Sequence, residues 1–142
     1  VNDSGVGISV PGSMQQSIDY WDASVAYPGS CTDCIGDDGH LTGYHLYQLD
    51  HDADLRMGFL SWTEDDVVLE RLPMEAEEYE AELLAAMAEL EGAHPERFRS
   101  FIADGVGHTF ILRDFDREVG GTTPRLWIER MLDGGDWVSV SD

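Results

Sequence analysis

The chain has 142 residues, 42% of them hydrophobic and 10% aromatic, which is enough for one globular domain with a buried core. It holds 29 Asp and Glu against eight Lys and Arg, a formal net charge of −21 at pH 7. Such a surface repels phosphate backbones and anionic lipids, so nucleic acids and membranes are not expected partners. The acids are spread along the chain, which indicates a solvated acidic surface rather than an acidic tail.

The first half of the chain reads as loops and short helices. Residues 1–5, V-N-D-S-G, resemble the end of a strand, and the chain does not begin with Met, so we expect a preceding segment. Residues 14–21 fit a short helix or a turn, and the Gly- and Asp-rich residues 28–39 fit a loop. Residues 41–52 predict a helix, because they place Leu41, Tyr44, His45 and Gln48 on related faces.

The second half has a clearer pattern. Residues 55–62, L-R-M-G-F-L-S-W, form an apolar run typical of a strand buried on both faces of a parallel sheet. Residues 74–91 repeat apolar side chains at helical spacing, and residues 97–105 alternate like a second strand. Thr123 and Pro124 are an N-cap and a first-turn proline, and they predict a short amphipathic helix after them. Strands that alternate with helices predict one α/β domain with a mostly parallel sheet and flanking helices.

The two cysteines, Cys31 and Cys34, form a C-T-D-C unit inside the predicted loop. A redox motif of this spacing would stand where a strand leads into a helix, and a zinc site would need converging histidines. We expect a disulfide between them first, reduced structural thiols second, and metal or redox chemistry third. A disulfide would agree with an extracellular location.

Acidic and basic side chains stand where the two predicted strands end. Glu64, Asp65 and Asp66 follow the first strand, and His108 follows the second in a Gly-flanked turn. Function collects at the carboxyl ends of strands in α/β sheets, and an acid followed by a histidine matches the Ser…Asp…His order of α/β-hydrolases. Asp65 is the predicted acid and Asp66 the reserve. In this chemistry the carboxylate orients the imidazole, which takes the serine proton.

The other histidines and a run of aspartates do not match a metal-binding motif. Asp50, Asp52 and Asp54 have the spacing of a calcium loop, but Leu55 and Ser61 stand where an EF-hand needs Gly and Glu. The remaining histidines lack metal-ligand spacing: His40, His45, His51 and His94. We predict no metal and no cofactor, and an irregular calcium site at the three aspartates is the alternative.

Both ends of the chain resemble the pectin acetylesterase family. The similarity is carried by F-R-S-F-I-A-D-G-V-G-H-T-F, by V-G-G-T-T-P-R-L-W-I-E-R-M-L with the later Trp137, and by N-D-S-G at residues 2–5. The resemblance implies the C-terminal portion of an α/β-hydrolase domain over residues 1–142. It also implies that His108 is the catalytic base, that Asp65 is its acid, and that Asp3 and Ser4 line the substrate site.

The resemblance further implies a secreted serine esterase that removes a small acyl group, with acetyl expected, from a polysaccharide or a related ester. The G-x-S-x-G elbow of the nucleophile does not occur here. Ser4 in D-S-G precedes the histidine and the acid, unlike the serine of trypsin-like proteases. The expected partner is therefore an N-terminal portion of the same enzyme that carries the serine. The alternatives are a lipase or polyester hydrolase on this fold, and a non-catalytic binding or structural module.

Overall fold

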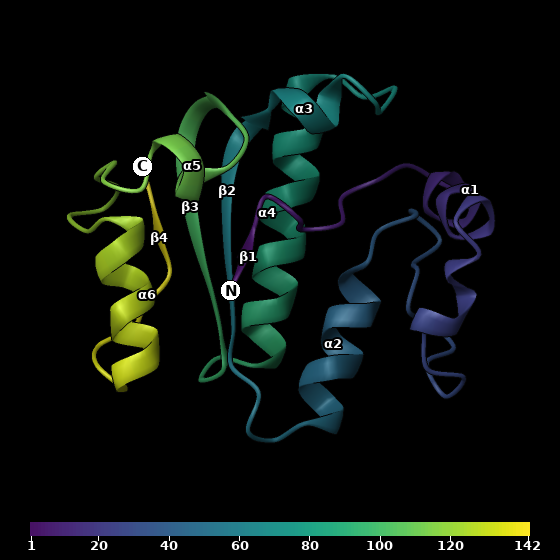
Figure 1. The fold of residues 1–142 in the computed structure, drawn as a ribbon, viewed down its shortest axis with the longest axis horizontal. Coiled ribbons are helices and arrows are strands. Elements are labelled where there is room, and N and C mark those ends of the chain that lie inside the picture. Colours follow the sequence, from purple (N-terminus) through teal and green to yellow (C-terminus); the bar gives the residue numbers. More distant parts are fainter.

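The computed structural model describes residues 1–142 as one parallel sheet between two layers of helices (Figure 1). The strands are β1 (Asn2–Asp3), β2 (Met57–Asp65), β3 (Phe98–Gly107) and β4 (Val140–Ser141). They lie in the order β1-β2-β3-β4, and each neighbouring pair is parallel. The predicted α/β class with a parallel sheet and flanking helices is therefore confirmed.

The helices connect the strands. Before β2 lie α1 (Ser13–Tyr20), the 3-10 helix η1 (Ala23–Ala26) and α2 (Thr42–His51). Between β2 and β3 lie α3 (Asp66–Leu69) and α4 (Ala76–Ala93), and between β3 and β4 lie α5 (Phe110–Arg113) and α6 (Pro124–Asp133). None of them is long and apolar enough to cross a membrane.

Side chains of β2 and β3 alternate between two apolar cores, because successive residues of a strand point to opposite faces. Phe59 and Ile102 face α2 and α4, whereas Leu60 and Phe101 face α5 and α6. The first core contains Val6, Ile8, Leu49, Met57, Phe59, Tyr79, Leu83, Ala86, Met87, Leu90, Phe98 and Ile102. The second contains Leu60, Trp62, Phe101, Ala103, Phe110, Val119, Trp127, Met131 and Trp137. Both faces of β2 are thus covered, as its apolar run predicts.

Most predicted elements are present, with shifted ends. The helices predicted at residues 14–21, 41–52 and 74–91 correspond to α1, α2 and α4. Thr123 caps α6 by accepting a hydrogen bond from the backbone N–H of Leu126 at 3.4 Å, as predicted. Both long strands extend beyond the predicted residues, β2 by three to Asp65 and β3 by two to Gly107.

His45 on α2 makes the stability of this fold depend on pH. Its ring is buried and packs edge-to-face on Phe59, with ring centroids 4.8 Å apart. Burial lowers the pKa of His45 below its usual range, and hydrogen bonds with Gln48 and the Val6 backbone oppose the shift only in part.

A histidine with a lowered pKa takes up its proton more readily in the unfolded chain, so low pH favours unfolding. Neutral His45 makes its full contribution to the unfolding free energy above pH about 6.5. Below that pH the contribution is lost by at most about 1.4 kcal/mol per pH unit. We expect urea denaturation to give a smaller decrease in unfolding free energy from pH 7.5 to 5.5 for His45→Gln than for the wild type. His51→Gln, which alters an exposed ring of the same helix, is the control. Equal pH dependence in wild type and His45→Gln would contradict this assignment.

Candidate active site

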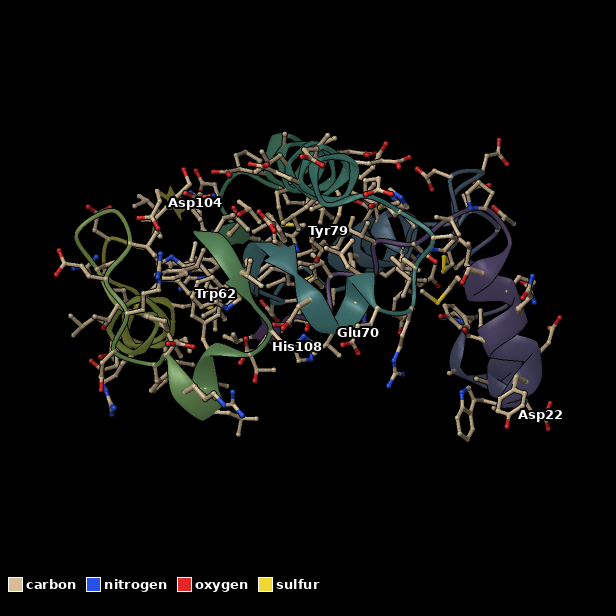
Figure 2. The ribbon with its side chains drawn as sticks, turned by 90° about the horizontal axis from the view of Figure 1, so that it is seen from above. Asp22, Trp62, Glu70, Tyr79, Asp104 and His108 are labelled. Carbon is tan, nitrogen blue, oxygen red and sulfur yellow. A yellow bond between two sulfur atoms is a disulfide. The ribbon has the colours of Figure 1, made fainter.

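The carboxyl ends of β2 and β3 meet at one edge of the sheet. Asp65, the last residue of β2, is paired in register with Gly107, the last residue of β3. His108 follows at once and lies between α3 and α5 when this edge is seen from above (Figure 2). Two segments more than forty residues apart are thus brought together by parallel pairing.

Asp65 and His108 form the hydrogen bond that the sequence predicts. Nδ1 of His108 lies 2.9 Å from Oδ1 and 2.8 Å from Oδ2 of Asp65. The Asp65 side chain is completely buried, and Oδ1 also accepts from the backbone N–H of Val68 at 3.0 Å, which caps α3. A buried carboxylate needs such partners, and these two fix its orientation. Asp66, the reserve candidate, begins α3 and lines the neighbouring pocket.

The contact with Asp65 determines the tautomer of His108. A carboxylate only accepts, so Nδ1 donates and carries the proton, which leaves Nε2 as the free acceptor in the neutral ring. The His108 side chain is 36% exposed, whereas that of Asp65 is 0% exposed. One side of the imidazole is therefore held inside the protein while the ring remains accessible to a reactant. A general base needs this arrangement.

Trp62 packs against residues on both sides of His108, namely Gly107 and Phe110. Its indole is stacked on Phe110, with ring centroids 4.9 Å apart and planes 6° from parallel. The guanidinium carbon of Arg117 lies 4.7 Å from the centroid of the Trp62 ring. Gly107 lies so close to this indole that an added Cβ would stand 2.5 Å from Cε2.

Gly107→Ala should therefore displace the residue that precedes His108. Because Trp62 is stacked on Phe110 and covered by Arg117, the loop must move rather than the indole. Overpacking of this kind costs about 1–3 kcal/mol. Thermal denaturation measures this loss of stability. Gly92→Ala is the control, since its added Cβ meets no atom within 4 Å. Wild-type stability in Gly107→Ala would contradict the tight contact.

A pocket of about 380 Å³ opens beside His108. Its lining joins the end of β3 with α3 and α5. The apolar lining residues are Val67, Val106 and Leu112, and the polar ones include Asp66, Thr109, Arg113 and Asp114. The pocket presents His108 to a ligand that has both apolar and hydrogen-bonding groups.

Tyr79 of α4 lies on the other face of the sheet from Trp62 (Figure 2). Burial raises the pKa of its phenol to about 12, with a hydrogen bond to Ser61 opposing the rise and the Asp65 charge adding to it. The phenol is therefore protonated at neutral pH. It adds a neutral, buried neighbour to the Asp65 carboxylate, and no pattern in the sequence indicates that neighbourhood.

Asp3 and Ser4 lie at the end of β1, beside the same loop. The Asp3 carboxylate accepts from the backbone N–H groups of Phe110 and Ile111, and the Ser4 hydroxyl donates to the backbone carbonyl of His108. The structure thus brings together all the residues predicted for the site, while the predicted substrate contacts of Asp3 and Ser4 stay a prediction. The sequence did not indicate their contacts with the His108 loop.

Cys31 and Cys34 lie apart from this site, between η1 and α2, where they form the predicted disulfide. Their Cα atoms are 5.4 Å apart, a normal separation for a disulfide. No group of three or more His, Cys, Asp or Glu side chains has an arrangement that could hold a metal ion.

Comparisons with known protein families, with characterised proteins and with solved structures gave no match to this chain. The interpretation of the site therefore depends on its own geometry.

Proposed function

We propose that this chain contributes the histidine and the acid of a Ser-His-Asp triad in an esterase with the α/β-hydrolase fold. The observation that carries the proposal is the hydrogen bond from Nδ1 of His108 to the buried Asp65 at the ends of adjacent parallel strands. The order of acid and histidine along the chain is that of α/β-hydrolases, and the ends of the chain resemble the pectin acetylesterase family.

In the proposed reaction a serine Oγ attacks the ester carbonyl carbon while Nε2 of His108 takes the serine proton. The resulting imidazolium is stabilised by Asp65, which remains ionised. His108 then gives the proton to the alcohol oxygen, the C–O bond breaks, and an acyl-serine remains. A water molecule, deprotonated by His108, attacks the acyl-serine and releases the acid, and the proton returns from His108 to the serine oxygen. No cofactor takes part in these steps.

The proposed nucleophile comes from a segment outside residues 1–142, an N-terminal portion of the same enzyme or a separate chain. Ser4 is the candidate within this chain, but its hydroxyl donates to the His108 carbonyl and the residue is only 6% exposed. A serine nucleophile needs its hydroxyl free to hydrogen-bond with Nε2 of the base.

The proposed substrate is a small acyl ester, with acetyl on a polysaccharide as the leading case. Thr109, Arg113 and Asp114 line the pocket beside His108 and offer donors and acceptors to the hydroxyl groups of a sugar. Extracellular action is part of the proposal, and the Cys31–Cys34 disulfide supports it.

A lipase or polyester hydrolase is the second candidate, and the apolar part of the pocket favours it. Val67, Val106 and Leu112 line the pocket and are 37%, 61% and 79% exposed. Such side chains can contact a longer acyl chain, because removal of apolar surface from water is favourable.

One experiment tests both candidates. The complete protein, residues 1–142 with the segment that carries the serine, is assayed on p-nitrophenyl esters from acetate to octanoate and on acetylated polysaccharide. The leading proposal expects the highest kcat/KM for acetate and release of acetate from the polymer. A maximum at longer chains would favour the second candidate. Absence of hydrolysis on every ester would contradict both and indicate a binding or structural module.

A further inference from the structure

We propose that Asp3 and Ser4 are positioning residues for His108. They act from the end of β1 on the backbone of the loop that carries His108, although Ser4 and His108 are 104 residues apart in the sequence. The inference deepens the proposed function, since its catalytic meaning depends on His108 being the base.

The Asp3 carboxylate caps the first turn of α5 with both of its oxygens. Oδ1 accepts from the backbone N–H of Phe110, and Oδ2 accepts from that of Ile111, each at 3.0 Å. Hydrogen bonds with one charged partner are stronger than neutral ones, and two of them fix both position and direction. The turn that follows His108 is therefore tied to β1.

Ser4 ties down His108 itself. Its hydroxyl donates to the His108 carbonyl, and its backbone N–H donates to the Leu60 carbonyl of β2 at 2.9 Å. Ser4 has a φ of 68°, a left-handed conformation that costs energy for a residue with a side chain. The side chain of Asn2 closes this turn, because it donates to the Gly5 carbonyl at 2.7 Å and accepts from the Gly5 N–H at 3.0 Å.

These contacts hold His108 from a second direction. Asp65 fixes the imidazole through Nδ1, whereas Asp3 and Ser4 fix the backbone from the His108 carbonyl to the Ile111 amide. A ring held only by Asp65 could pivot about that hydrogen bond and move Nε2. Catalytic groups must stay within about 0.5 Å of the productive position, and both anchors are needed for that precision.

The sequence resemblance implies a different role, direct contact of Asp3 and Ser4 with the substrate. In the structure both Asp3 oxygens already accept from backbone amides, and the Ser4 hydroxyl already donates to a carbonyl. A substrate acceptor would have to break the Ser4 hydrogen bond, and a substrate hydroxyl could use only the lone pairs that the Asp3 oxygens have left. The two roles therefore predict different kinetics, because a substrate contact acts on KM and a positioning residue on kcat.

The test uses the complete protein with the variants Asp3→Ala, Asp3→Asn, Ser4→Ala and Ser4→Gly. Asp3→Asn keeps the shape and one accepting oxygen, and Ser4→Gly removes the hydroxyl while tolerating the left-handed backbone. Asp54→Ala is the matched control, because it removes one acidic charge from an exposed position before β2. Hydrogen exchange is followed at the amides of Phe110 and Ile111 together with kcat and KM for p-nitrophenyl acetate.

We expect Asp3→Ala to speed exchange of the two amides by about tenfold or more, since both lose a charged acceptor. We expect kcat to decrease by about 10²-fold with little change in KM. Asp3→Asn should give exchange rates and a kcat between those of Asp3→Ala and the wild type. Both Ser4 variants should lower kcat. If Asp3→Ala does not fold, Asp3→Asn and Ser4→Gly decide the result.

Exchange in Asp3→Ala as slow as in Asp54→Ala would overturn the proposal. A rise in KM with kcat unchanged would also overturn it, and would return Asp3 to a substrate contact. Faster exchange with wild-type kcat would also overturn the proposal, because the loop would then be free without consequence for His108. If the wild type hydrolyses no ester, the proposed function fails, and the exchange rates still decide whether Asp3 holds the loop.

Discussion

Replacement of His108 by alanine is expected to lower kcat for ester hydrolysis by about 10⁴-fold or more, as loss of a triad histidine does. The physical reason is that His108 is the one imidazole in the pocket. Its Nδ1 is hydrogen-bonded to Asp65, which leaves Nε2 free to take the serine proton. KM should change much less, because His108 acts on the reacting atoms rather than on substrate affinity. Initial rates with p-nitrophenyl acetate measure both constants.

His108→Gln separates the loss of proton transfer from the loss of a hydrogen bond. The glutamine amide can still donate toward Asp65 but cannot shuttle a proton, so kcat should decrease as far as in His108→Ala. The His108 side chain is partly exposed, so we expect thermal stability to stay close to that of the wild type. Turnover unchanged in both variants would give His108 a structural role and contradict the triad.

Asp65→Asn is expected to lower kcat by about 10⁴-fold while the fold is retained. The asparagine side chain can still accept from the Val68 N–H and cap α3, because Asn is among the best N-cap residues. Its NH₂ group would face Nδ1 of His108, however, and would favour the tautomer with the proton on Nε2. The ring could then no longer accept the serine proton.

Two variants control this experiment. Asp65→Ala loses the cap as well as the charge, so it should also lose about 1 kcal/mol or more of unfolding free energy in a urea titration. Asp66→Asn removes the same charge one residue later, from a side chain that lines the pocket, and should lower kcat much less. A loss in Asp66→Asn equal to that in Asp65→Asn would refute the choice of Asp65 as the acid.

The long elements of the fold could be predicted because their apolar side chains follow the period of one structure. Leu83 and Leu90 of α4 are buried at helical spacing, and the run from Met57 to Trp62 is buried throughout. The strand end expected at residues 1–5 corresponds to β1, whereas the two-residue strand β4 carries no period that could be recognised. The same holds for α3 and α5, which are single turns of four residues.

The end of β2 was underestimated for a different reason. Glu64 and Asp65 are acidic, and acids after an apolar run are usual in a solvated loop. Here Asp65 continues the strand and is completely buried, because His108 and the Val68 N–H satisfy its carboxylate. Both partners come from segments that follow the strand, so burial of this acid depends on tertiary structure.

The central pair of the site could be predicted, and its surroundings could not. Asp65 and His108 follow consecutive strands, and parallel neighbours must end at the same edge. The contacts of Asp3 with α5 span 107 and 108 residues and depend on the register of β1 against β2. The contact between Gly107 and Trp62 likewise depends on pairing of β2 with β3, and no local pattern indicates it.

The most direct test of the triad proposal is to find the serine that His108 activates. The complete protein is treated with a fluorophosphonate probe, which reacts with activated serines, and the labelled residue is identified by peptide mass spectrometry. The proposal predicts one labelled serine outside residues 1–142, with labelling lost in His108→Ala and retained in His51→Ala, a change at an exposed histidine of α2. Label on Ser4 or on another serine of this chain, or label that persists in His108→Ala, would contradict it.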